Sequence, residues 1–245
     1  MLGLRKVLGW IIPKQIKTAI KCLKVLEIDY GHTYSVKEQA AIDRQGNPIP
    51  WFTYPAITYL KQLDFSNKLV FEYGSGNSTL FWGARAERVI SIEHHDKWYQ
   101  KMEKIVSKNT DLKLIADDFY PHAISKYEED FDVIVIDGAG QYRYDCAVEA
   151  IKKLKPGGMI ILDNSDWFVN TSKLLREANL IQVDMSGFAP INSFVHTTSF
   201  FIHREFNFKF NQPPQSLIGS IKCDKISVFG GDGPREDLSS KSSVN

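Results

Sequence analysis

The chain has 245 residues, of which 43% are hydrophobic and 24% are charged, and its formal net charge is only +1. This length and hydrophobic content predict one sizeable core, in a single domain with appendages. The nearly balanced charge argues against a nucleic-acid substrate, which a strongly basic surface would favour. Three cysteines, Cys22, Cys146 and Cys223, are far apart and have no metal-binding spacing, which predicts a reduced, cytoplasmic protein.

The first 26 residues predict a basic amphipathic helix that begins after Pro13. Apolar residues recur there at helical spacing: Ile16, Ala19, Ile20, Leu23 and Leu26. Basic residues are interleaved with them: Arg5, Lys6, Lys14, Lys17, Lys21 and Lys24. Such a helix either docks on the anionic inner face of a membrane or packs its apolar side on the domain or a second subunit, and packing is the commoner use. No run reaches the roughly 18 apolar residues of a membrane span.

Residues 46–50 form a turn-rich connection, and the aromatic residues Trp51 and Tyr54 follow it. These two rings are candidates for a lid over a ligand, because binding residues favour loops on a rigid scaffold. Ordinary packing of aromatic rings beside prolines is the alternative.

Residues 69–79 are the most informative stretch, because an apolar strand runs directly into the glycine pair Gly74 and Gly76. Glycine permits a sharp turn and a close approach of the backbone to a ligand, and a helix beginning near Ser78 would aim N–H groups at an anionic group. The third glycine of a dinucleotide fingerprint is replaced by Thr79, and Glu72 precedes the loop.

The pattern Glu-x-Gly-x-Gly-x-x-Thr resembles the first motif of the class I S-adenosylmethionine-dependent methyltransferases. The resemblance covers about residues 50–205. It implies an α/β, Rossmann-like fold with a mostly parallel seven-stranded sheet and helices on both faces. It also implies S-adenosylmethionine as the cofactor, held by Glu72, Gly74, Gly76, Ser78 and Thr79. An NAD(P)-dependent oxidoreductase would share the loop, but Glu72 and Thr79 argue against it.

Four more apolar runs, at residues 89–93, 112–116, 131–136 and 159–162, predict further strands of a parallel sheet. Acidic residues end them, at the edge where α/β folds bind ligands. Glu93 lies 19 residues after Gly74, a spacing that suits a carboxylate binding a ribose. One of Asp117 and Asp118 is expected near the adenine. Residues 155–158, Lys-Pro-Gly-Gly, predict a structural turn before the fifth strand.

Asp137, Asp163 and Asn164 follow two strands that we expect to be neighbours, and their hard oxygens suit magnesium or calcium. The arrangement is similar to that of the metal-dependent O-methyltransferases of the catechol and caffeoyl-CoA type, and Trp167 matches an aromatic residue of that family. These families tend to carry a basic residue soon after the first Asp, whereas residues 138–141 separate Asp137 from Arg143 here. A turn with a helix cap is the structural alternative.

Two residues are candidate proton acceptors, Asp137 and His196, the latter in a presumed loop. Together these features predict methyl transfer to a hydroxyl of a small molecule or glycan. A non-catalytic, membrane-associated binding module is another alternative.

Alternating residues at 197–201 and 205–210 predict an antiparallel strand pair, and the tail from Gly230 has a disordered composition. The expected organisation is a basic helix and connection over residues 1–50, a methyltransferase domain over 51–210 and an extension over 211–245.

Overall fold

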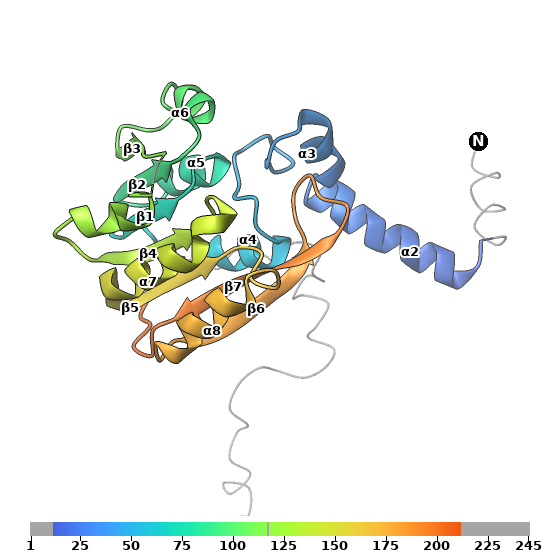
Figure 1. Ribbon diagram of the computed structural model, residues 1–245. Helices are drawn as coiled ribbons and strands as arrows, with labels where there is room; N and C mark the ends of the chain where they lie inside the picture. Colours follow the sequence, from blue (N-terminus) through green and yellow to red (C-terminus); the bar gives the residue numbers. More distant parts are fainter. Residues whose placement is uncertain (1–11, 117, 212–245) are drawn as a thin grey trace, which may run out of the picture.

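A computed structural model of the chain describes residues 12–116 and 118–211. Its centre is a seven-stranded sheet in the order β3-β2-β1-β4-β5-β7-β6 (Figure 1). The strands are β1 Leu69–Tyr73, β2 Arg88–Glu93, β3 Thr110–Leu114, β4 Phe131–Ile136, β5 Leu154–Leu162, β6 Ile181–Phe188 and β7 Val195–Ile202. The first five are parallel, and β7 pairs antiparallel with both β5 and β6. The predicted α/β, mostly parallel sheet is therefore confirmed.

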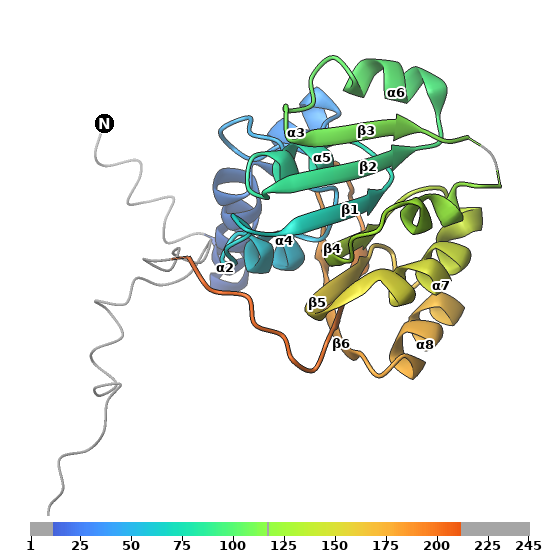
Figure 2. The same ribbon diagram turned by 90° about the vertical axis from the view of Figure 1, so that its left-hand side faces the viewer.

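The sheet separates two hydrophobic cores, because successive residues of each strand point to opposite faces. In β4, Val133 and Val135 join one core, and Ile134 and Ile136 join the other. The first core is covered by α4 (Tyr54–Leu60) and α5 (Asn77–Gly83). The second is covered by the 3₁₀ segment η2 (Pro121–Lys126) with α7 (Arg143–Lys153) and α8 (Val169–Glu177). Figure 2 shows these helical layers on the two sides of the sheet. Burial on both faces explains the nearly continuous apolar runs of β4 and β5.

The strand boundaries agree with the sequence best where the runs are wholly apolar. Residues 69–73 and 131–136 are strands as predicted. Strand β3 spans residues 110–114, so it begins and ends two residues earlier than the predicted strand at 112–116. The predicted turn at 155–158 lies inside β5, where the register with β4 shifts between Phe131 and Val133. Gly157 has φ +82° there, so the glycines serve an irregularity within the strand.

The prediction of a strand at residues 205–210 is wrong. Its partner strand β7 is real, but the neighbour of β7 is β6, at residues 181–188. Phe206 and Phe208 stack on each other at 4.8 Å and pack at the edge of the first core. Their alternation reflects one-sided burial, and the segment forms only an isolated antiparallel bridge, between Phe210 and Leu63.

The N-terminal helix exists as predicted. It comprises α2 (Lys14–Lys24) and continues through the π-helical turn η1 (Val25–Asp29) towards α3 (His32–Glu38). Figure 1 shows α2 projecting away from the sheet, and none of its residues is buried. Its predicted packing on the domain is therefore limited to Leu26 and Tyr30, which touch the first core just after it. None of the helices in the described part is both long and apolar enough to span a bilayer. The predicted disordered tail and Cys223 lie outside the described residues.

Candidate functional site

Two cavities adjoin at the carboxyl edge of the parallel strands. The loop cavity, of about 180 Å³, is lined by Ser75, Gly76, Asn77 and Ser78 of the glycine loop together with Trp98, Lys101 and residues 39–41. The carboxylate cavity, of about 440 Å³, is lined by Asp137, Arg143, Asp163, Asn164 and His196 together with three aromatic residues. Trp51 and Asp137 line both cavities. The two cavities therefore lie next to each other at these two side chains.

The two glycines of the loop have different roles. Gly74 has φ +104°, and a Cβ there would lie 3.0 Å from the backbone oxygen of Asp137. It is thus required by the turn and by packing against the end of β4. Gly76 lines the loop cavity, and a Cβ there would meet only the Trp98 ring at 3.9 Å. Of the two, only Gly76 exposes its Cα to the space that a ligand would occupy.

Glu72 lies beneath the loop and does not line either cavity. Its Oε2 accepts hydrogen bonds from Thr79 Oγ1 at 2.5 Å and Ser91 Oγ at 3.1 Å. Thr79 Oγ1 in turn accepts from the N–H of Gly76 at 3.0 Å. Burial raises the pKa of Glu72 to about 7, although these hydroxyl groups and Ser78 oppose the shift. The structure therefore places Glu72 and Thr79 as supports of the loop, while Ser78 lies at the cavity wall.

Glu93 lies at the end of β2 beside the loop, where a ribose carboxylate was predicted. Its Oε1 accepts from the backbone N–H groups of His94 and His95, and its Oε2 accepts from Ser75 Oγ at 2.5 Å. The Ser75 hydroxyl is thus a replaceable donor to Oε2. Trp98 fixes the same loop by donating from Nε1 to the backbone oxygen of Ser75 at 2.7 Å.

Asp118, from the acidic pair after β3, does not line the loop cavity. Asp117 lies outside the described residues. Asp118 is exposed, accepts a hydrogen bond from the Tyr142 hydroxyl at 3.3 Å and faces a separate cavity beside His122. Nearer the loop, Tyr120 is fully buried and its ring contacts His94. The predicted adenine contact of Asp118 therefore gains no support from its position.

Arg143 organises the carboxylate cavity, and its side chain is almost buried. Its Nη2 lies 3.1 Å from Asp137 Oδ1, and its Nη1 donates to the backbone oxygen of Asp163 at 2.5 Å and to Asn164 Oδ1 at 3.3 Å. Its Nε donates to the backbone oxygen of Gly138 at 3.1 Å. The guanidinium therefore joins the ends of β4 and β5 and places a permanent positive charge against the side-chain oxygens of Asp137 and Asn164.

This arrangement does not fit the predicted divalent cation. Arg143 already engages oxygens of Asp137 and Asn164, and Asp163 Oδ1 accepts from Thr198 Oγ1 at 2.5 Å. A cation held by Asp137 and Asn164 would compete with the guanidinium for their side-chain oxygens. Burial and the nearby Asp163 raise the pKa of Asp137, while Arg143 opposes that shift. The donor set is therefore arranged around an internal arginine, and the metal site stays a prediction from the sequence.

His196 is the histidine nearest these carboxylates. Its side chain is only 1% exposed, and its Nε2 lies 3.5 Å from Asp163 Oδ1. Within the described residues, neither ring nitrogen has a hydrogen-bond partner. It lies in β7, so the predicted loop position is wrong, but it still lines the cavity. A buried imidazole with unpaired nitrogens beside a carboxylate is suited to accept a proton.

Aromatic rings form the walls of the carboxylate cavity. Trp167 packs near Phe194 and His196, with ring centroids 6.3 Å apart in both cases. Trp51 is half exposed and faces both cavities, whereas Tyr54 is buried in α4 and its hydroxyl bonds to His32. Of these two residues, only Trp51 therefore has a position that fits the predicted lid.

Positive backbone dihedrals mark the site as well. Asn164 has φ +53° and Ile191 has φ +70°. A β-branched residue in the left-handed region is a genuine outlier, and such strain is concentrated at ligand-binding positions. Ile191 lines the loop cavity, and Asn192 and Phe194, from the same loop between β6 and β7, line the carboxylate cavity.

Several site residues were missed from the sequence: Trp98, Lys101, Arg143, Asn192 and Phe194. Arg143 carried a usable signal, because it is the first residue of the helix that follows β4 and so lies at the ligand-binding edge. The other four carried no comparable signal. Trp98 and Lys101 come from a short helix, α6 (Asp96–Met102), and the remaining two come from a hairpin loop whose first strand was not predicted.

Comparison with protein families also indicates a methyltransferase domain. A family described as methyltransferase domain matches residues 71–165. The O-methyltransferase TomG of Streptomyces achromogenes, solved in complex with S-adenosylmethionine, has a TM-score of 0.50 at 13% identity over 75% of this chain and 89% of that one. Precorrin-6y C5,15-methyltransferase of Geobacter metallireducens has a TM-score of 0.49 at 16% identity over 68% and 95%. A search of curated proteins finds no match.

The TomG likeness concerns the fold alone, whereas the family match covers the stretch from the end of β1 to just beyond β5, including the glycine loop and the two strand-end aspartates. Residues 71–165 therefore match a methyltransferase domain, and the sheet that contains them has the fold of the class I, S-adenosylmethionine-dependent methyltransferases.

Proposed function

We propose that the chain binds S-adenosylmethionine with its methionine end in the loop cavity and transfers the methyl group to a hydroxyl oxygen in the carboxylate cavity. The observation that carries this proposal is the meeting of the two cavities at Trp51 and Asp137. Methyl transfer requires donor and acceptor to be aligned for in-line displacement, and adjoining cavities provide that alignment.

The loop cavity supplies groups that suit the methionine end of the cofactor. Lys101 lines it and brings a positive charge for the carboxylate, next to the backbone of Gly76. The cavity is smaller than the roughly 300–1,000 Å³ typical for a drug-sized ligand. The adenosine end therefore extends outside it, past Ser75 towards Glu93. A ribose hydroxyl would take over the hydrogen bond that Ser75 now donates to Glu93.

The carboxylate cavity supplies the remaining chemistry. The acceptor oxygen attacks the methyl carbon as the carbon–sulfur bond breaks, and the hydroxyl proton passes to an imidazole nitrogen of His196. Asp163, 3.5 Å from His196, stabilises the resulting imidazolium. Arg143 provides a fixed positive charge that favours the negative charge developing on the acceptor oxygen. These steps use only side chains of this chain.

A sugar hydroxyl is the acceptor that we favour. Its lining includes polar side chains that can bond to hydroxyl groups, from Asp137, Arg143, Asn164, Asn192 and His196. A phenol with one or two hydroxyls would use fewer of these groups, whereas a sugar can bond to several of them as well as to His196, whose ring nitrogens have no partner within the described residues. A sugar ring presents hydroxyls on most of its edge and apolar C–H groups on its face, which suits the walls formed by Trp51 and Trp167.

The test begins with cofactor binding. We expect S-adenosylmethionine and S-adenosylhomocysteine to bind in calorimetric titrations, and NADH not to bind. Gly76→Ala should weaken cofactor binding about ten-fold or more, because the added methyl group enters the loop cavity. Gly140→Ala is the matched control, since Gly140 lies outside that cavity and has normal contact distances for a Cβ.

The acceptor is then found by incubating the protein with cofactor carrying a labelled methyl group and with fractionated saccharides and phenols. Label in an ether linkage on a saccharide supports the proposal. Cofactor binding combined with label only on nitrogen or carbon acceptors would contradict O-methylation while leaving the methyltransferase assignment intact.

A further inference from the structure

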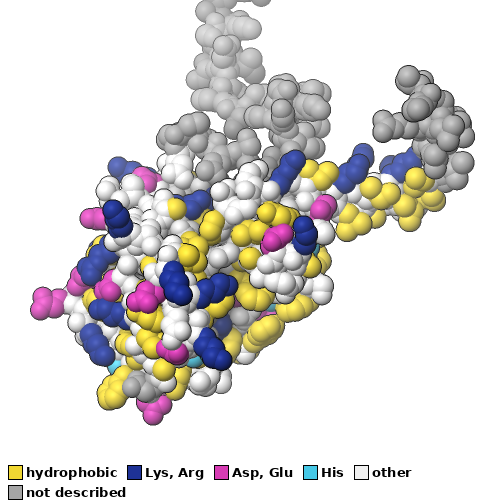
Figure 3. Space-filling view, turned by 90° about the horizontal axis from the view of Figure 1, so that it is seen from above, with side chains coloured by type: hydrophobic (Ala, Val, Ile, Leu, Met, Phe, Trp, Pro, Cys, Tyr) yellow, Lys and Arg dark blue, Asp and Glu magenta, His cyan; other side chains and the backbone are white. Residues whose placement is uncertain are grey.

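Helix α2 carries an apolar side that the domain does not cover. Ile16, Ile20 and Leu23 are 50%, 40% and 63% exposed. They lie on one side of the helix because they are spaced four and three residues apart. In Figure 3, hydrophobic side chains run along one side of the projecting helix and lysines along the other. Exposure of this kind at three successive positions of one side is unusual for a surface that faces only water.

The charge of α2 is uniform in sign. The helix contains four lysines, Lys14, Lys17, Lys21 and Lys24, and no acidic residue in its sequence KQIKTAIKCLK. Lys17 and Lys24 lie three residues before and four residues after Ile20, so they border the apolar side on the helix surface. A lysine in that position can keep its stem along apolar material and its ammonium group at a polar boundary.

We propose that α2 docks on an anionic membrane surface, with Ile16, Ile20 and Leu23 below the headgroups and the bordering lysines at the level of the phosphates. An interfacial helix combines these features: a strong segregation of apolar and polar sides, low overall hydrophobicity and a lysine-rich polar face. At 11 residues and about 1.5 Å per residue, α2 lies on such a surface and is too short to cross it.

The domain itself is not the partner of this side. Helical hydrogen bonding continues from α2 into η1, where the N–H of Tyr30 donates to the backbone oxygen of Val25 at 3.2 Å. Leu26 and Tyr30 then pack against the first core. This continuous, anchored helix holds α2 away from the sheet, so its apolar side cannot fold back without breaking the turn at residues 25–29.

A second copy of the chain fits less well. Two α2 helices packed side by side would bring four lysines towards four lysines with no acidic residue in either helix to pair them, which is unfavourable. Three exposed apolar side chains on each copy also fall short of the roughly 1,200 Å² of a stable interface. Phosphates of an anionic membrane carry negative charge, which the sequence of α2 does not contain.

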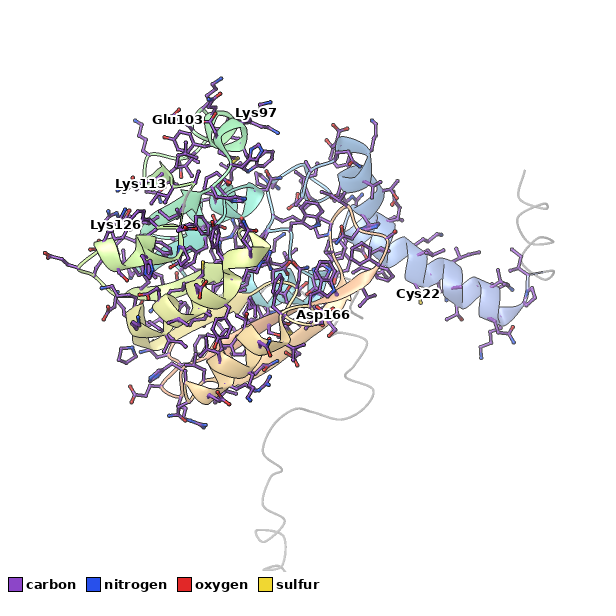
Figure 4. The ribbon with its side chains drawn as sticks, viewed as in Figure 1. Cys22, Lys97, Glu103, Lys113, Lys126 and Asp166 are labelled. Atoms are coloured by element: carbon purple, nitrogen blue, oxygen red, sulfur yellow. The ribbon has the colours of Figure 1, made fainter. Side chains whose placement is uncertain are left out.

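The experiment uses the full chain and sucrose-loaded vesicles, either of phosphatidylcholine alone or with about one third phosphatidylglycerol. We expect sedimentation with the anionic vesicles only, and loss of sedimentation as salt shortens the range of the electrostatic attraction. Lys17→Gln with Lys24→Gln should lower the partition coefficient about ten-fold or more. The matched control is Lys97→Gln with Lys126→Gln, which removes the same charge from exposed positions remote from α2 (Figure 4) and should leave the partition coefficient within about two-fold.

A second pair of variants tests the apolar side. Ile20→Gln with Leu23→Gln should lower the partition coefficient about ten-fold or more. The variant lacks two apolar side chains that the membrane-bound protein would bury among the lipids. Ile105→Gln, at a position 51% exposed outside α2, should leave it unchanged. Circular dichroism and cofactor titration on every variant show that the helix and the domain remain folded, and neither measurement depends on the acceptor.

Three outcomes would overturn the proposal. The first is an absence of sedimentation with anionic vesicles at low salt. The second is sedimentation that the α2 lysine variants and the control variants reduce equally. The third is a dimer in sedimentation velocity that Ile20→Gln with Leu23→Gln dissociates, since that result would assign the apolar side to a second copy.

Discussion

Nη2 of Arg143 lies 3.1 Å from Oδ1 of Asp137, and the same guanidinium reaches the backbone oxygen of Asp163. A residue on the first turn of α7 thereby connects the ends of two neighbouring strands. The connection fixes the distance between the carboxylate that faces the loop cavity and the Asp163–His196 pair. It also supplies, from the chain itself, the positive charge that the sequence suggested a metal ion would provide.

Methyl transfer should therefore continue in excess chelator. Arg143 already engages the oxygens of Asp137 and Asn164 that a divalent cation would need. Removing divalent cations from the solution should therefore change the rate by less than about two-fold. The measurement is the initial rate with and without chelator, on protein dialysed to remove metal. Loss of activity that magnesium restores would establish the metal site and would require Arg143 to move.

Replacement of Arg143 should be costly for the fold. Arg143→Met keeps most of the apolar stem but leaves Asp137 and two backbone oxygens without their donor. We expect a loss of roughly 2–4 kcal/mol in the free energy of unfolding, measured in urea. The double variant with Asp137→Asn should lose less than the sum of the two single variants, because the unpaired charge is also removed. Additive losses would show that the pair is not coupled.

Gly74 and Gly76 should separate folding from cofactor binding. Gly74→Ala places a Cβ 3.0 Å from a backbone oxygen at φ +104°, so we expect a loss of roughly 1–3 kcal/mol in stability. Gly76→Ala has space and an extended backbone, so it should keep its stability and lose cofactor affinity. Urea unfolding and calorimetry on both variants check this contrast. Equal effects of the two variants on stability would contradict it.

The sequence predicts the central sheet well for a physical reason. Strands buried on both faces, such as β1 and β4, are apolar throughout, and that signal does not depend on what packs against them. Strand β6 has one face towards α4 and another that carries Gln182, Asp184 and Ser186. Its alternation of Ile181, Val183 and Met185 with these polar residues is a strand signal that went unrecognised, whereas residues 205–210 alternate as clearly but form only an isolated bridge to Leu63.

The site is predictable where strand ends fix it. Glu93, Asp137 and Asp163 follow apolar strands and reach the expected edge of the sheet. Trp98 and Asn192 reach the same site from a short helix and a hairpin loop, and their placement depends on tertiary packing. The role of Glu72 was also beyond prediction, because its position in β1 does not reveal that its carboxylate points beneath the loop.

Glu72 should make stability depend on pH. Burial raises its folded pKa from 4.5 to about 7, so the neutral carboxyl is favoured in the folded state. Its stabilising contribution is fully present below about pH 4.5 and is lost as the pH rises through about 7. The loss is on the order of 3 kcal/mol. Urea unfolding of wild type and Glu72→Gln from pH 5 to pH 8 should show a steeper decline for wild type. Parallel curves would place the pKa of Glu72 at its ordinary value.

His196 is the residue whose replacement should separate chemistry from binding. His196→Gln retains a polar side chain in the cavity but cannot accept the acceptor proton. General-base catalysis is typically worth about 100-fold or more, so we expect a loss of that size in kcat with cofactor affinity unchanged. The measurements are steady-state kinetics for kcat and calorimetric titration for cofactor affinity, on wild type and variant. His122→Gln is the control, because His122 is exposed and faces a different cavity. If His196→Gln keeps the wild-type kcat, the base is another group, and Asp137→Asn becomes the variant that identifies it.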